Sequence, residues 1–456
     1  MAEQPRRRRS LLADLRPLRE SPPFRRLWIG TTVSSLGGAM TGFAVVLQTY
    51  DLTHSSVAVG AIGLAQAIPA LVIGLFGGSF ADALDRRRLV LATGCCLTAV
   101  SAVFAVQAYL GLGQLWLLYL LAGAQAAVQS VDGPARRTFL PRLLPADRIP
   151  AGVALGQASF YVSFLAGPVL AGAVTAAAGL RVCYLIDALS FGAALYSVAR
   201  LPAMPPQPGQ TRPGVRAVAE GLRYIRRQPV LAAAFLADID ATVFGMPVAL
   251  FPALNAERFG GSPQTLGLLN AGLAAGGLLG SALSGPAGRV SRKALAMLLT
   301  VSIWGAAIAG FGFARILWLA LLMLVVAGAA DTTSVIFRGS IAQAITPDRL
   351  RGRVMAVDYV VGNAVPRLGN FEAGAVASLT SPTISAVSGG VATVAGALLI
   401  RLAFPVVARY RAPAEPAPPP PAAPAQPSPA ADAADPADAA DPAHAEAPGE
   451  QQQATP

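Results

Sequence analysis

The sequence has little charge and almost no lysine, histidine or cysteine for a chain of 456 residues. Only 13% of its residues are charged, whereas about 25% is typical of a soluble domain. All but one of its 35 basic residues are arginines, and the single lysine, Lys293, lies in the segment SRKAL. A phosphate-binding Walker A loop needs a lysine directly after its glycines, so this sequence contains no such nucleotide site.

The rarity of metal-binding side chains excludes further classes of protein, those built on a metal site. The two histidines, His54 and His444, are too far apart for a zinc-protease motif. Cys95, Cys96 and Cys183 lie inside apolar runs, and adjacent cysteines in a helix form neither a normal disulfide nor a spaced metal site. We therefore expect no metal site, no cofactor and no catalytic residue, and a protein that is not an enzyme.

Apolar residues, by contrast, make up 54% of the chain and recur in runs of about 18 residues or more, which indicates membrane-spanning helices. The expected fold class is an all-α integral membrane protein. The predicted spans are residues 25–50, 57–80, 88–109, 114–134, 150–177, 181–199, 230–252, 263–287, 293–313, 316–338, 354–378 and 384–406.

The arginines gather in alternate loops between these spans. If the N-terminus is cytoplasmic, 31 of the 35 basic residues lie in cytoplasmic segments, three lie outside (Arg181, Arg258 and Arg315), and Arg367 lies within a span. Cytoplasmic loops collect basic residues, so the pattern predicts a multi-pass protein of the cell membrane with both termini in the cytoplasm. The net charge of +11 then fits a surface facing anionic lipid better than one that binds nucleic acid.

Composition divides the chain into five parts. We predict a basic cytoplasmic N-terminus (1–24), a six-helix bundle (25–199), a cytoplasmic linker (200–229), a second six-helix bundle (230–410) and a disordered Pro/Ala-rich cytoplasmic tail (411–456). Within the linker, VRAVAEGLRYIRRQP has an apolar face and an arginine face. It predicts an amphipathic helix that lies on the inner membrane surface.

The two bundles repeat one another. The fourth cytoplasmic link, PARRTFLPRLLPADRIPAGVA, matches the tenth, IFRGSIAQAITPDRLRGRVMA, so that Arg137 aligns with Arg338 and Asp147 with Asp348. A six-plus-six repeat about a cytoplasmic linker is typical of transporters, whose substrate path runs between the halves.

Several charged residues lie inside predicted spans, where an unpartnered charge costs several kcal/mol. Asp238 and Asp240 are two residues apart, so they point about 200° apart and cannot both face one cavity. Arg367 and Glu372 are five apart, which makes an ion pair between them unexpected. The candidates for proton coupling or a substrate cavity are Asp187, Asp238, Asp240, Asp331, Arg367 and Glu372, with Asp238, Asp331 and Glu372 leading. The alternative for each is a polar contact between helices.

Five motifs carry a family resemblance: YDLTHSSVAVG, GGSFADALDRRRLVL, AGPVLAG, TPDRLRGRVMA and RLGNFEAG. Together and in this order they resemble the major facilitator superfamily. The chain is most similar to its drug–proton antiporter branch, which contains the enterobactin exporter and macrolide and tetracycline efflux pumps. The resemblance implies twelve helices in two pseudo-symmetric six-helix bundles.

The resemblance also implies roles for two groups of residues. In the loop after the second span, Asp82 would bind the N-terminus of the eleventh helix and close the cytoplasmic side, although Ala83 stands where the family usually has a basic residue. The AGPVLAG segment is similar to a fifth-span motif of exporters. The residues of the loop motif are Gly77, Gly78, Asp82, Arg86, Arg87, Arg351 and Arg353, and those of the fifth-span motif are Gly167, Pro168 and Gly172.

The sequence thus predicts a secondary transporter that exports hydrophobic or amphipathic small molecules by proton antiport. A siderophore exporter is the alternative within this class, and a membrane sensor or scaffold without transport is the alternative outside it. The expected partners are a small-molecule substrate, protons and the anionic inner leaflet, and the expected state is a monomer.

Overall fold

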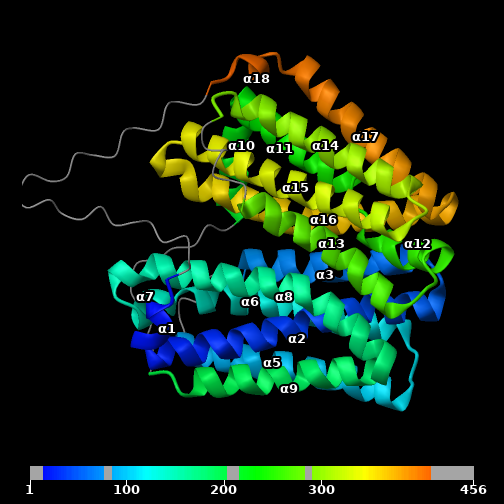
Figure 1. Cartoon of the computed structure of the whole chain (residues 1–456). Helices are drawn as coiled ribbons and strands as arrows, with labels where there is room; N and C mark the ends of the chain where they lie inside the picture. The colour runs from blue at the N-terminus through cyan, green and yellow to red at the C-terminus, as the bar shows by residue number, and fades with distance from the viewer. Residues whose placement is uncertain (1–13, 77–84, 203–214, 283–289, 412–456) are drawn as a thin grey trace, which may run out of the picture. The chain divides into compact units, whose positions relative to one another are not determined.

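The computed structural model describes residues 14–76, 85–202, 215–282 and 290–411 (Figure 1). The described helices belong to one compact unit, Met1–Pro413, and the other unit, Ala414–Pro456, lies outside the described residues. Every regular element in the described ranges is helical. The predicted all-helical membrane fold is confirmed.

Each predicted span corresponds to a long helical segment. In the first half these are α2 (Pro22–Thr53), α3 (Ser56–Phe76), α5 (Arg86–Leu110), α6 (Leu115–Arg137), α8 (Ile149–Ala178) and α9 (Leu180–Ala199), with the short α1 (Arg16–Glu20), α7 (Leu140–Leu143) and η1 (Ala146–Arg148) beside them.

The second half begins with the linker helix α10 (Val215–Arg227). It continues with α11 (Pro229–Phe244), η2 (Val248–Leu250), α12 (Phe251–Arg258), α13 (Pro263–Ala282), α14 (Lys293–Phe313), α15 (Leu317–Ile345), α16 (Asp348–Leu379), α17 (Pro382–Ala403) and α18 (Val406–Arg409).

Ten segments of the described chain are long and apolar enough to cross a membrane. The other two predicted spans are α6 and α16. Polar residues such as Asp132 in α6, and Arg367 and Glu372 in α16, reduce their mean hydropathy. Polar groups within a span are functional candidates, so these two helices are of particular interest.

Capping side chains and a glycine mark the ends of several helices. The side chains of Ser21, Asp85 and Ser381 accept hydrogen bonds from backbone N–H groups in the first turns of α2, α5 and α17. Such N-caps satisfy donors that have no partner within the helix. Gly111 adopts a φ of 63° where α5 ends, a left-handed conformation that suits glycine.

The seventh span is interrupted, whereas the sequence predicted one continuous helix over 230–252. α11 ends at Phe244, and the chain continues as η2 and α12 to Arg258. Pro247 cannot donate a backbone hydrogen bond, which favours the break. The Asn370 side chain of α16 accepts a 3.1 Å hydrogen bond from the Ala249 N–H. Broken membrane helices need such partners for their freed backbone groups.

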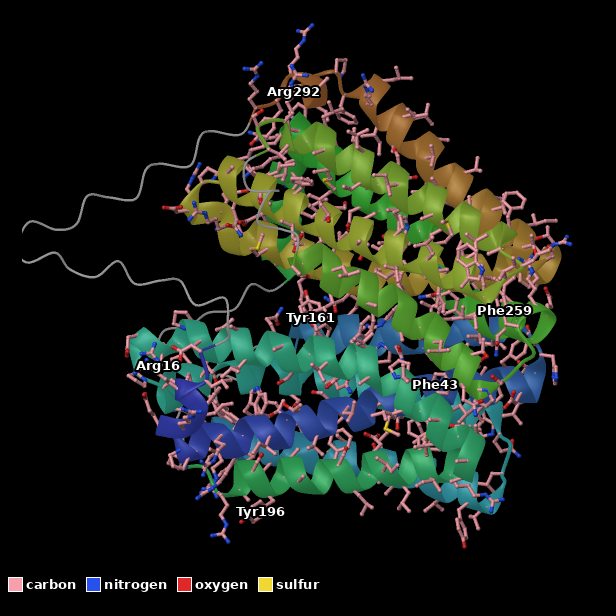
Figure 2. The ribbon with its side chains drawn as sticks, viewed as in Figure 1. Arg16, Phe43, Tyr161, Tyr196, Phe259 and Arg292 are labelled. Atoms are coloured by element: carbon pink, nitrogen blue, oxygen red, sulfur yellow. The ribbon has the colours of Figure 1, made fainter. Side chains whose placement is uncertain are left out.

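The two ends of the bundles differ in charge. We call the end with residues 86–88, 223–227, 292–293 and 349–353 the basic end, and the end with residues 111–114, 259–262 and 314–316 the opposite end. Figure 2 labels Arg16 and Arg292 near the basic end and Phe259 at the opposite end.

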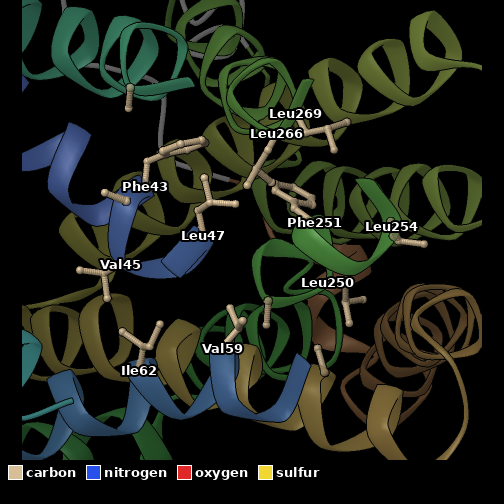
Figure 3. Close-up of a cluster of buried hydrophobic side chains, with 14 of the residues drawn as sticks. Phe43, Val45, Leu47, Val59, Ile62, Leu250, Phe251, Leu254, Leu266 and Leu269 are labelled. Atoms are coloured by element: carbon tan, nitrogen blue, oxygen red, sulfur yellow. The ribbon is translucent and has the colours of Figure 1, made fainter. Parts of the chain in front are cut away.

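One buried apolar cluster joins the two bundles at the opposite end. It contains Phe43 and Leu47 of α2, Val59 of α3, Phe251 of α12 and Leu266 of α13 (Figure 3). The other three clusters each lie within one half, over residues 225–407 or residues 24–201. Among the described residues, apolar packing therefore links the halves at the opposite end.

The linker helix α10 packs on protein. Ile225 is buried in a cluster of the second bundle, and the Tyr224 hydroxyl donates to the Ile345 carbonyl at 2.9 Å. Glu220 forms a 2.6 Å ion pair with Arg353 of α16, and Gly221 lies against the Arg353 carbonyl. Leu222 of the same apolar face is exposed, so contact of this helix with the inner membrane surface stays a prediction.

Candidate coupling site

A buried arginine in α15 joins three helices of the second bundle. Arg338 forms an ion pair with Asp238 of α11 and another with Asp358 of α16, with 3.2 Å between Nε and Oδ1. Arg338 and Asp238 are each only 4% exposed. The guanidinium also lies over the Phe235 ring, 5.8 Å from its centroid. The two carboxylates offset part of the cost of burying the arginine.

Asp331 adds a third acid to this group. It lies seven residues before Arg338 in α15, about two helical turns, so the two side chains project from the same face. The charges of Asp238 and Arg338 both act on the Asp331 carboxyl. We call Asp238, Asp331, Arg338 and Asp358 the charge cluster.

Asp240 does not belong to the charge cluster. It is half-buried and packs against Gly396 of α17. Asp238 and Asp240 thus face different neighbours, as their spacing requires. Asp238 is the member of this pair that reaches Arg338 of α15.

Arg367 and Glu372 lie in α16 and are both half-buried, and no ion pair joins them in the described structure. Tyr359 lies eight residues before Arg367, about two helical turns, so the two side chains project from the same face of α16. The Asn363 amide, between them in sequence, donates to the Tyr359 carbonyl at 2.8 Å. The side chains of Tyr359, Asn363 and Arg367 occupy successive turns of one face of α16. Among the described residues Arg367 makes no ion pair.

Asp187 lies elsewhere, in α9 of the first bundle. It is fully buried and accepts hydrogen bonds from Thr41 of α2 at 2.8 Å and Ser101 of α5 at 2.7 Å. Gly37 of α2 also packs against it. The carboxylate thus ties three helices together, which favours the structural alternative for this residue.

Only part of the loop motif lies within the described residues. Gly77, Gly78 and Asp82 lie outside the described residues, so the proposed contact of Asp82 stays a prediction. Arg86 is buried, and Arg87 donates to the Ala199 carbonyl at 2.5 Å.

The basic residues at the start of α16 have other partners. Arg351 forms a 2.9 Å ion pair with Asp348 in the same helix, and Arg353 pairs with Glu220 of α10. The N-terminus of α16 is therefore already attached to the linker helix.

The fifth-span motif lies at close helix contacts. Gly167 packs against Ala39 of α2, and Gly172 packs against the Pro263 carbonyl of α13. Gly267 of α13 in turn packs against the Pro168 carbonyl. Small residues let helix backbones approach closely, so this motif shapes the contact between the two bundles.

Sequence reasoning missed Arg338 and Asp358 as site residues. The tenth span was predicted to end at 338, which placed Arg338 in a cytoplasmic link, but α15 continues to Ile345. The seven-residue spacing from Asp331 was a signal that could have been used. An ion pair in the first bundle was also missed: Asp132 and Arg136 of α6 lie 2.5 Å apart.

In the described part of the chain, twelve long helical segments in two halves, with buried charges between helices, are typical of a multi-pass membrane transporter. Residues 12–426 match the family model described as transmembrane secretion effector. The chain belongs to this family of the major facilitator superfamily.

Relatives and solved structures agree with this assignment. The chain is 26% identical to the enterobactin exporter EntS of Citrobacter koseri over 411 residues, covering 89% of this chain and 97% of that protein. It is 25% identical to the enterobactin exporter EntS of Escherichia coli over 409 residues, with the same coverage.

Two solved structures show the shared fold. A POT family transporter in complex with 5-aminolevulinic acid matches with a TM-score of 0.70 at 12% identity, covering 85% of this chain and 97% of that one. A bacterial homologue of the iron transporter ferroportin, in an inward-facing state, matches with a TM-score of 0.65 at 15% identity, covering 85% and 98%.

Proposed function

We propose that this transporter exports a siderophore-type small molecule across the cell membrane and is driven by proton antiport. The observation that carries the proposal is the 26% identity to an enterobactin exporter over 97% of that protein's length. This relationship favours the siderophore alternative over the multidrug substrates that the motifs favoured.

Arg367 is the proposed contact for the substrate. A catecholate siderophore is anionic and aromatic, so it suits a surface that carries both a cation and an aromatic ring. Arg367 and Tyr359 lie on one face of α16, eight residues apart. Arg338 is unsuited to this role, because Asp238 and Asp358 already pair with it.

The charge cluster is the proposed site of proton coupling. When a proton binds Asp238, that carboxylate no longer attracts Arg338, and the tie between α11 and α15 weakens. Release of the proton restores it. A difference of a few kcal/mol between these arrangements is enough to shift an alternating-access equilibrium.

The packing at the opposite end fits one state of this cycle. If the basic end is cytoplasmic, the apolar cluster of Figure 3 closes the outer side. The described arrangement is then the state that takes up substrate from the cytoplasm.

Export in cells tests the substrate. The chain is expressed in a bacterium that lacks its own enterobactin exporter, and catecholate siderophore in the medium is measured beside a panel of drug susceptibilities. Restored secretion with unchanged susceptibilities is expected. Unchanged secretion with raised drug resistance would overturn the siderophore assignment in favour of multidrug efflux.

Variants and reconstituted protein test the contact and the transport class. Arg367→Gln should reduce secretion at least about tenfold if a charge-assisted contact is lost, whereas Arg401→Gln on the exposed end of α17 should not. Purified protein in liposomes with an imposed pH gradient then separates a transporter from a non-transporting sensor, which would show no flux.

A further inference from the structure

A cavity of about 530 Å³ opens at the opposite end of the first bundle. Its described lining comes from that bundle alone and includes Gln48 and Leu52 of α2, Ala108 of α5, Ala178 of α8 and Arg181 of α9. None of these residues belongs to the charge cluster or to the proposed substrate contact. We call this space the outer-end cavity, and its size is that of a pocket for a small molecule or a head group.

The buried side of the cavity presents a fixed hydrogen-bond donor. Gln48 is only 8% exposed, and its Oε1 accepts from the Gln107 amide at 3.0 Å and from the Tyr184 hydroxyl at 2.7 Å. Its Nε2 donates to Gln107 Oε1 at 3.1 Å. An amide nitrogen carries two N–H groups, and no described residue accepts from the second one. Because Gln48 lines the cavity, an acceptor on a ligand can satisfy this donor.

The exposed side of the cavity carries a cation. Arg181 lies in the first turn of α9, and its guanidinium stands over the Tyr109 ring, 5.6 Å from the centroid. It is exposed and makes no ion pair with a described residue. Among the described residues that line the cavity none is an acid. A guanidinium in this setting suits a phosphate group, to which it can donate two parallel hydrogen bonds.

The mouth of the cavity is bordered by exposed apolar side chains. Leu52, Tyr109 and Leu110 are 42%, 72% and 65% exposed. They lie where α2 and α5 end and α9 begins, which is the boundary between hydrocarbon and water for membrane-spanning helices. Tyrosine is typical of that boundary. A ligand with acyl chains can therefore cover this border while its head group enters the cavity.

We propose that the outer-end cavity binds the head group of an anionic phospholipid of the phosphatidylglycerol type. The phosphate pairs with Arg181, and a glycerol hydroxyl accepts the second N–H of Gln48. The ethanolammonium group of phosphatidylethanolamine is a cation, so Arg181 repels it. A soluble organic phosphate shares the phosphate chemistry, but the exposed apolar border of the mouth favours a lipid.

Cysteine labelling in the full chain tests occupancy of the cavity. The three native cysteines are replaced by alanine, and L52C is introduced in the lining. The protein is placed in phosphatidylcholine nanodiscs with a rising fraction of phosphatidylglycerol, and the rate of reaction with uncharged N-ethylmaleimide is measured. We expect phosphatidylglycerol to slow the labelling of L52C at least about fivefold. L379C, at an 85% exposed position of α16, is the reference and should keep its rate.

Two pairs of variants assign the effect to the cavity. R181Q should need at least about a tenfold larger fraction of phosphatidylglycerol for the same protection of L52C, because a charge-assisted contact is lost. R315Q removes another exposed arginine at the opposite end and should behave like the parent. A178F fills the cavity and should abolish the dependence on lipid, whereas A177F, one position away and outside the lining, should keep it. Thermal melting in pure phosphatidylcholine checks folding.

Three results would overturn the proposal. The first is labelling of L52C that does not respond to phosphatidylglycerol, or a response that R181Q and A178F leave unchanged. The second is equal protection by phosphatidylethanolamine, which would remove the selection for an anionic head group. The third is equal protection by millimolar glycerol 3-phosphate in pure phosphatidylcholine nanodiscs, which would make the cavity a site for a soluble anion.

Discussion

Arg338 of α15 forms an ion pair with Asp238 of α11, one hundred residues earlier in the chain, and both side chains are almost fully buried. Each residue alone would be an uncompensated charge within the membrane fold. Since Arg338 also pairs with Asp358, the three helices α11, α15 and α16 share one set of charges. Loss of either partner should therefore affect folding as well as transport.

Asp238→Asn should reduce both stability and proton-driven flux. Breaking a buried ion pair costs about 3–5 kcal/mol, and here Asp358 remains to compensate part of the loss. Asp331→Asn should instead keep stability near that of the parent protein and abolish uphill export, because no described ion pair involves Asp331. Thermal melting and pH-gradient-driven flux on the same liposome-reconstituted variants provide the measurements. Full uphill flux in both variants would place coupling elsewhere.

Asp187→Ala should reduce stability and leave transport by the folded protein unchanged. The change leaves the buried Thr41 and Ser101 hydroxyls without their acceptor, at about 1–3 kcal/mol for each unsatisfied group. We expect lower thermal stability and unchanged flux per folded molecule. A variant of normal stability that has lost coupling would return Asp187 to the list of coupling acids.

Gly374→Ala should open the opposite end. A Cβ at Gly374 of α16 would overlap the Ser56 carbonyl of α3, so the two helices must separate there. Overpacking of this kind costs about 1–3 kcal/mol, which shifts a two-state equilibrium by roughly 5- to 150-fold. S56C, at a buried position, should then react faster with maleimide. Gly352→Ala in the same helix meets open space and should leave the rate unchanged.

Labelling should establish the orientation. Gln114 and Ala146 are exposed at the opposite end and the basic end, respectively. In a background without native cysteines, Q114C should react with an impermeant thiol reagent added to intact cells, and A146C should react only after permeabilisation. The reverse pattern would place the arginine-rich loops outside the cell.

The contribution of the Asp14–Arg16 contact to stability should not depend on pH near neutrality. Hydrogen bonds from Arg16 lower the pKa of Asp14 to about 2. A carboxylate with a lowered pKa stabilises the fold above its ordinary pKa of about 3.9, and the effect is lost as pH falls through the folded-state value. The difference in melting temperature between the parent and Asp14→Asn should thus stay constant from about pH 5 to 8. A difference that fades across that range would contradict the assigned contact.

The sequence by itself determined the class of the protein. Hydropathy is a local property, so the spans could be located from composition, and the arginine bias and the six-plus-six repeat needed no knowledge of packing. The acids inside the spans were also visible one by one. Helical spacing even showed that Asp238 and Asp240 must face different ways.

Only the tertiary structure decided which partner each charge meets. Periodicity tells which residues share a helix face but not which helix lies opposite, because that depends on contacts between segments far apart in sequence. Asp238 meets Arg338, Asp187 meets two hydroxyls, and Asn370 meets the backbone at the break in the seventh span. The sequence pattern of α10 also did not tell that Ile225 is buried in the second bundle while Leu222 is exposed, because that depends on where the rest of the second bundle lies.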